Sequence, residues 1–199
     1  MNVSKELKRD TEVALTQNST SNAGSTTVAR QTRGLEGWIQ TNVDAHTGYT
    51  AGAYLTDPGT ASTDGTQRAF TETLLKTALQ SAYTSGGSPE LIMVPPAAKQ
   101  TFSTFTGNST RFKDADATLN AAISIYVSDF GTLQAVPNRF MATRDVFVLQ
   151  SDKLAIAYLR PFMTKEIAAT GDAEKRELIV EYCLECRAPK AHGAIYDVQ

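Results

Sequence analysis

The sequence of 199 residues lacks the features that mark membrane, nucleic-acid-binding and secreted proteins. Its longest uncharged and mostly apolar run, residues 121–128, is far shorter than the roughly 20 residues that cross a bilayer, so it is not a membrane span. With 19 basic and 21 acidic residues, the net charge is −2 and no basic block occurs, which disfavours tight binding to nucleic-acid phosphates. No apolar segment follows the N-terminal charges, so we expect no secretory signal and an intracellular context.

Soft metal ligands are also scarce, since Cys183, Cys186, His46 and His192 are all that the chain has. A zinc site would need a second pair of ligands beside the C-x-x-C pair, and a redox motif would need a strand-to-helix turn. Residues 177–187 instead alternate apolar and polar side chains, as a half-buried strand does. The odd spacing then sends the two cysteines to opposite faces. We therefore predict two reduced packing cysteines, and two histidines on the surface or in loops.

Recognisable catalytic motifs are absent as well. A nucleophilic hydrolase needs Ser or Cys beside a base, and neither histidine lies in such a setting. The G-x-S-x-G elbow, the phosphate-binding loop and the dinucleotide fingerprint do not occur. Glu177, Glu181 and Glu185 lie four residues apart near Arg187 and could suggest an acid/base or cation site, but we favour the solvent face of a strand. We predict no catalytic, cofactor-binding or metal-binding residues and no enzyme activity.

The residues that are present, 41% hydrophobic and 20% charged, are typical of a folded domain or two small lobes. Helical spacing predicts helices in the first twenty residues, at 35–40, at 70–82 and at 97–105. Apolar or alternating runs predict strands at 91–94, 123–127, 133–136, 146–149, 154–159 and 177–187. Residues 17–32 and 44–65 are rich in small polar residues, so we expect two loops, of which the second is exposed and mobile. The fold class is α+β.

The order of these elements suggests two discontinuous lobes. Residues 1–65 and 141–199, with the N-terminal helix and the C-terminal strands, would form one lobe, and residues 66–140 would be inserted as the second. The first helix starts almost at residue 1 with no turn or strand before it, which suggests that structure is missing upstream.

Several short sequences also occur in a fixed order along the chain. The C-terminal half contains IYVSDFGTL (125–133), VPNRF (136–140), LRPF (159–162), TGDAEKR (170–176) and AHG (191–193). The N-terminal half contains KELKRD (5–10), TRGLEGW (32–38), AFTE (69–72) and FSTFTG (102–107). Together these sequences closely resemble one group of tailed-bacteriophage major capsid proteins, which have the Hong Kong 97-type capsid fold.

The resemblance implies a peripheral lobe, with a spine helix and long strands, and an axial lobe that meets its copies at five- and six-fold capsomer centres. The predicted ranges fit, with the peripheral lobe at 1–65 and 141–199 and the axial lobe at 66–140. The implied function is that of a structural head protein that self-assembles into an icosahedral shell. The implied partners are copies of itself, in pentamers and hexamers, around double-stranded DNA bound without sequence specificity. The implied location is the virion, after synthesis in the cytoplasm of the host bacterium.

Members of the group carry an N-terminal arm and an extended loop ahead of the spine helix, and we find neither here. We therefore expect a truncated, proteolysed or degenerate prophage copy, with the 199-residue chain a monomer or weak small oligomer. No lysine can be matched to the lysine–asparagine cross-link of some such capsids. Two alternatives remain: the shell protein of a bacterial cargo compartment, which shares the fold, and a small enzyme or zinc module centred on Cys183, Cys186 and His192.

Overall fold

The computed structural model describes residues 3–53, 56–57, 59–105, 125–168, 171–172 and 175–199. The chain begins with the helix α1, Val3–Thr16, which buries Thr11, Leu15 and Thr16 against the body and exposes its charged side chains. A loop then leads to the single turn of helix α2, Leu35–Trp38. Helix α1 lies within the predicted first twenty residues, and α2 covers the first four residues of the helix predicted at 35–40.

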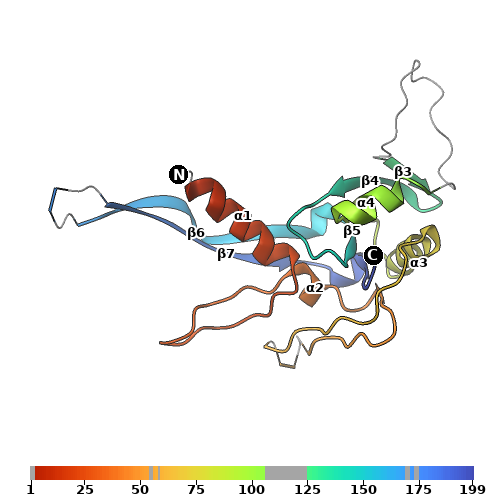
Figure 1. The fold of residues 1–199 in the computed structure, drawn as a ribbon, viewed down its shortest axis with the longest axis horizontal. Coiled ribbons are helices and arrows are strands. Elements are labelled where there is room, and N and C mark those ends of the chain that lie inside the picture. The colour runs from red at the N-terminus through yellow and green to blue at the C-terminus, as the bar shows by residue number, and fades with distance from the viewer. Residues whose placement is uncertain (1–2, 54–55, 58, 106–124, 169–170, 173–174) are drawn as a thin grey trace, which may run out of the picture.

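The body of the molecule contains a mixed six-stranded sheet (Figure 1). Its strands, in spatial order, are β1 (Val43–Asp44), β8 (Gly193–Ile195), β5 (Val146–Leu149), β2 (Leu91–Val94), β4 (Gly131–Pro137) and β3 (Ile125–Ser128). The β1–β8 and β2–β4 pairs are parallel, whereas the other neighbours are antiparallel. Strands from both ends of the chain therefore share one sheet with strands from its middle.

Two further helices pack against this sheet. Helix α3, Glu72–Thr84, begins where the Thr71 hydroxyl accepts a hydrogen bond from the Leu74 amide at 3.5 Å. It ends before Gly86, whose φ of +87° suits glycine at a helix terminus. Helix α4, Pro96–Phe102, carries proline in its first turn, where no backbone donor is needed. Helix α3 contacts β8 and β1, and α4 contacts β4.

The core has two parts because the sheet is covered on both faces. All four residues of β5 are buried, and successive strand residues point to opposite sides. Val146 and Val148 join the cluster that contains residues of α3 and α4. Phe147 and Leu149 join the other cluster, with Leu15 of α1. Strand β5 therefore lies at the centre of the body, with one core cluster on each face of the sheet.

The last large element is a two-stranded antiparallel ribbon that projects from the body (Figure 1). It follows the short 3-10 helix η1, Ser151–Lys153, and consists of β6, Leu154–Ile167, and β7, Lys175–Cys186. A second 3-10 helix, η2, Pro189–Ala191, leads from the ribbon into β8. Helix α1 lies beside the ribbon and contacts β7.

The α+β class is confirmed, as are the helices and most of the strands, although Ile123 and part of the turn at 170–173 lie outside the described residues. Two expectations need correction. Strand β6 continues to Ile167 instead of ending at 159. The segment 44–65 is not simply an exposed loop, because Asp44 pairs in β1, Thr50 bridges Thr63, and Ser62 is buried. Strands β1 and β8 were not predicted.

Candidate functional site

The ribbon is the region with the most unusual surface. Its strand β6 exposes a series of large apolar side chains: Ile156, Tyr158, Leu159, Met163 and Ile167. Leu159 is 75% exposed and sits where the register of the ribbon shifts. A two-stranded ribbon is marginally stable alone in water, and clustered exposed apolar side chains mark contact surfaces. We call these five side chains the ribbon apolar series.

The three glutamates that could have formed an acid/base site are spread along β7. Glu181 forms a two-pronged ion pair with Arg160 of β6, at 2.8 and 2.7 Å. Glu185 pairs with the neighbouring Arg187 at 2.9 Å, and Glu177 lies opposite Lys165 in the register. The row therefore belongs to a charged, exposed strand surface, and its carboxylates face cations instead of one another.

The C-x-x-C pair lies on β7, as predicted. Cys183 and Cys186 are both free thiols, at register positions opposite Ala157 and Leu154. The register is regular between them, so their odd spacing puts them on opposite faces. Both cysteines were predicted to be packing residues. Cys183 is exposed, so that prediction is wrong for it. Cys186 is half-buried, and burial raises its pKa.

The two histidines differ from each other. His46 is half-buried in a loop, where its Nδ1 lies 3.0 Å from the Thr66 carbonyl oxygen. His192 was expected on the surface or in a loop. It lies outside regular structure, between η2 and β8, but it is completely buried, which corrects the expectation of a surface position. Its Nδ1 accepts a hydrogen bond from the Gln150 amide at 3.1 Å, and burial lowers its pKa. The chain folds back through η2 into β8 and carries His192 inside.

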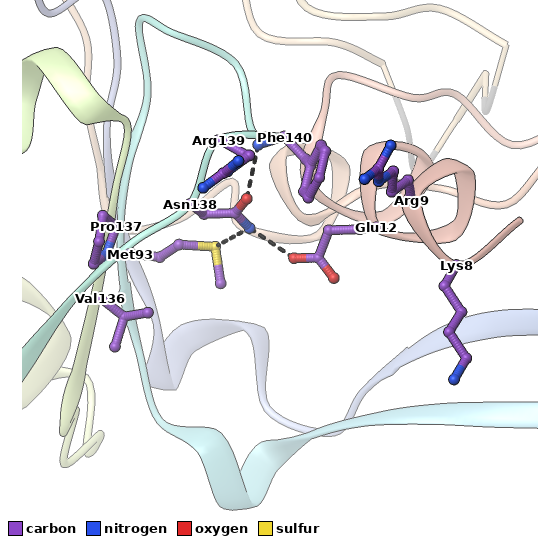
Figure 2. Close-up of a pocket in the computed structure, with 9 residues that line it drawn as sticks. All are labelled: Lys8, Arg9, Glu12, Met93, Val136, Pro137, Asn138, Arg139 and Phe140. Atoms are coloured by element: carbon purple, nitrogen blue, oxygen red, sulfur yellow. Dashed lines mark hydrogen bonds between the residues drawn. The ribbon is translucent and has the colours of Figure 1, made fainter. Parts of the chain in front are cut away.

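A hollow of about 410 Å³ lies between α1 and the end of β4 (Figure 2). Asn138 is at its centre, where its Nδ2 donates to Glu12 at 2.7 Å and its Oδ1 accepts from the Phe140 amide at 2.8 Å. The cationic side chains of Lys8, Arg9 and Arg139 also line the hollow. The hydrogen bond from Asn138 to Glu12 ties α1 to the end of β4.

A second hollow, of about 370 Å³, is acidic. Glu36 and Asp145 line it and are each only 3% exposed. Burial raises the pKa of Glu36 to about 7. The hydrogen bond that Glu36 accepts from Ser62 lowers this pKa, but by less than burial raises it. Burial, helped by the nearby Glu36, raises the pKa of Asp145 to about 8. Arg144 pairs with Asp64 at 3.3 Å and with Asp197 at 3.2 Å. We call this group the acidic corner.

Sequence reasoning missed both the acidic corner and the hollow beside α1. Asn138 and Arg139 were part of the VPNRF sequence that carries the family resemblance, but nothing there indicated Glu12 as their partner. Glu36 and Asp145 adjoin apolar runs, which is the one available sign of their burial. Among the described residues, no group of three acidic, histidine or cysteine side chains could hold a metal ion. No helix of the described chain is long and apolar enough to span a bilayer.

Comparison with known proteins points to one family. The family model for the SU10 major capsid protein matches residues 1–199. Among solved structures, a chain of the satellite phage P4 procapsid that includes the size determination (Sid) protein is similar, with a TM-score of 0.56 and 12% sequence identity. The match covers 98% of this chain and 61% of that one, and identity this low supports the fold alone. No curated protein matches the chain.

The match to the family model extends over the entire sequence, including the ribbon, the sheet and α1. The protein belongs to the SU10 major capsid protein family, a family of structural capsid proteins.

Proposed function

We propose that the chain is the subunit of an icosahedral, Hong Kong 97-type shell that self-assembles from copies of this protein and encloses double-stranded phage DNA. The role is structural, without catalysis or a cofactor. The proposed subunit is made in the cytoplasm of the host bacterium, forms pentamers and hexamers, and ends in the virion. Family membership supports this proposal, and the cargo-compartment alternative is not favoured.

The ribbon apolar series is the observation that carries the proposal. An extended subunit leaves apolar surface for its neighbours, and closed symmetry multiplies each contact. We infer that the ribbon apolar series is buried between subunits in the shell.

The peripheral lobe in this proposal comprises residues 1–65 and 141–199, and the axial lobe residues 66–140. The contact of α1 with the long strand β7 supports the assignment of α1 as the spine helix. The two lobes would share the six-stranded sheet, with the boundary between β5 and β2. The net charge of −2 supports a shell that encloses DNA without adhering to it.

The test compares Leu159→Asp with the wild-type protein by sedimentation velocity and electron microscopy at micromolar concentration. A charge at this position should abolish or strongly reduce particle formation, because it would be buried in an apolar contact. Val28→Asp is the matched control, since Val28 is also exposed but lies outside the ribbon. Particles or oligomers formed by Leu159→Asp to the same extent as by the wild type would contradict the proposal.

A further inference from the structure

Four segments that are distant in sequence converge at the acidic corner. They are α2 with Glu36, the loop at 62–65, the turn at 141–145 and the C-terminal residues 197–199. The Val198 amide donates to the Arg144 carbonyl at 2.9 Å, and the Gly65 amide donates to Asp197 Oδ1 at 2.7 Å. Gly65 has to be small, because a Cβ there would lie 2.8 Å from Asp197 Oδ2. The corner therefore fastens the C-terminal segment to the body.

Asp145 is the unusual member of this corner. Its side chain lines the acidic hollow and is 97% buried, since its exposure is 3%. It forms no hydrogen bond or ion pair with any of the described residues, although Arg144 is its neighbour in sequence. A buried carboxylate without a partner is costly, and the cost is avoided when the group is protonated.

The other charged groups facing Asp145 increase this cost. Glu36 on α2, Asp64 on the loop and Asp197 at the C-terminus are acidic, and all three disfavour ionisation of Asp145. Arg144 is the cation that acts on it, and Arg144 is already paired with Asp64 and Asp197. The end of α1 presents only the neutral Gln17 and Asn18 to the hollow.

The corner thus needs positive charge, and the structure restricts its source. No three acidic, histidine or cysteine side chains are grouped as metal ligands anywhere in the described residues. Glu36 is satisfied by one hydroxyl donor, Ser62, and Asp145 by none. A proton on each carboxyl removes the charge without any rearrangement. A proton is therefore the simplest source of this positive charge.

We propose that Glu36 and Asp145 form a proton-operated latch, closed over the C-terminal segment when both carboxyls are protonated and opened when both ionise. Ionisation adds two negative charges beside Asp64 and Asp197 in a buried site, and their repulsion separates the 141–145 turn from residues 197–199. This regulation is a property of the subunit itself and does not depend on its assembly into a shell.

The sign of the effect follows from the raised pKa values. A carboxyl whose pKa is higher in the folded state than in the unfolded state stabilises the fold below its unfolded pKa, near 4. That stabilisation is lost as the pH rises to the folded values of about 7 and 8. The latch is therefore closed in mild acid and opens in mildly alkaline solution.

The first measurement is an NMR titration of the side-chain carboxyl carbons in the wild-type protein. Two of them, assigned with Glu36→Gln and Asp145→Asn, should titrate well above the usual range for carboxyls. The second measurement follows the hydrogen-exchange protection of the Val198 and Gly65 amides. Between about pH 6 and pH 8.5 their protection factors should fall about tenfold or more relative to that of Ile92 in the buried strand β2.

Asp145→Asn and Glu36→Gln keep the shape of the side chain and remove its charge, so each should reduce this loss of protection. Asp152→Asn is the matched control, because Asp152 is exposed and pairs with Lys153, and it should leave the loss unchanged. The proposal is overturned if both carboxyls titrate near 4, or if they titrate near 7 to 8 while the protection of Val198 and Gly65 stays constant. If a variant fails to fold, the titration and hydrogen-exchange data of the wild-type protein still test the proposal.

Discussion

The six-stranded sheet and the ribbon are built from similar strand sequences but have opposite surroundings. All four residues of β5 are buried between two layers of side chains, whereas not one of the 14 residues of β6 is buried. Both strands contain valine, leucine, isoleucine or aromatic residues, which suit extended backbone. The difference is in what covers them, since β5 has helices on its two sides and β6 projects from the body.

This contrast separates two sources of stability. The sheet is stabilised by contacts within one chain, so the body should fold without any partner. The ribbon is anchored at its base and along α1, where Lys8 Nζ lies 6.0 Å from the centre of the Phe162 ring. Its outer apolar side chains, such as Leu159, are exposed in the single chain. Substitutions in the two regions should therefore affect different measurements.

The largest expected effect on folding is that of Phe147→Ala in β5. Phe147 is completely buried, and its ring packs edge-on against that of Tyr196, with 6.2 Å between the ring centroids. Removal of this ring therefore leaves a cavity in the core. The free energy of unfolding should fall by about 3 to 5 kcal/mol, measured by urea denaturation. Leu159→Ala in β6 is the matched comparison, and it should change that free energy by less than about 0.5 kcal/mol. Equal losses at the two positions would refute the distinction between body and ribbon.

The second prediction tests His192, which lies in the body and should respond to pH. Its pKa is lowered by burial, so its contribution to stability is complete above about pH 6.5 and is lost as the pH falls below that value. His192→Leu should cost about 1 to 3 kcal/mol at neutral pH, since it removes the acceptor of the Gln150 amide. Urea unfolding at several pH values should show a smaller acid-induced loss in the variant. If the variant loses as much stability in acid as the wild type does, then groups other than His192 cause the acid-induced loss.

The same comparison explains which parts of the fold were predictable from the sequence. Strands β5 and β2 were found because a strand buried on both faces is a continuous apolar run. Strands β1 and β8 were missed because two or three residues are too short to show any period. The end of β6 was missed because two register shifts interrupt its alternation after Tyr158.

The candidate sites were less predictable than the fold. The opposite faces of Cys183 and Cys186 followed from their spacing within one regular strand. The burial of His192, Glu36 and Asp145 depends on segments that are far apart in the sequence, so no local pattern could indicate it. The family resemblance identified the chain through whole sequences such as VPNRF, and their contacts with α1 became visible only in the folded molecule.

The third prediction concerns the junction between α1 and the sheet, which joins the two regions. Asn138→Ala removes the hydrogen bond to Glu12 and leaves that carboxylate without its amide donor. The free energy of unfolding should fall by about 1 to 2 kcal/mol, because a hydrogen bond to a charged group is lost. Asn138→Asp is the informative control, since it places two carboxylates together and should destabilise more than alanine. A neutral effect of both variants would mean that α1 is held by its apolar face alone.

The smallest expected effect is at the ion pair between Arg160 and Glu181 in the ribbon. Both side chains are partly exposed, and such pairs contribute about 0.2 to 1 kcal/mol even with two good hydrogen bonds. Arg160→Gln should therefore lower the free energy of unfolding by less than about 1 kcal/mol, with an effect that shrinks in high salt. A double-mutant cycle with Glu181→Gln measures the coupling directly. A coupling well above 1 kcal/mol would show that the ribbon is more strongly held by its own side chains than its exposure indicates.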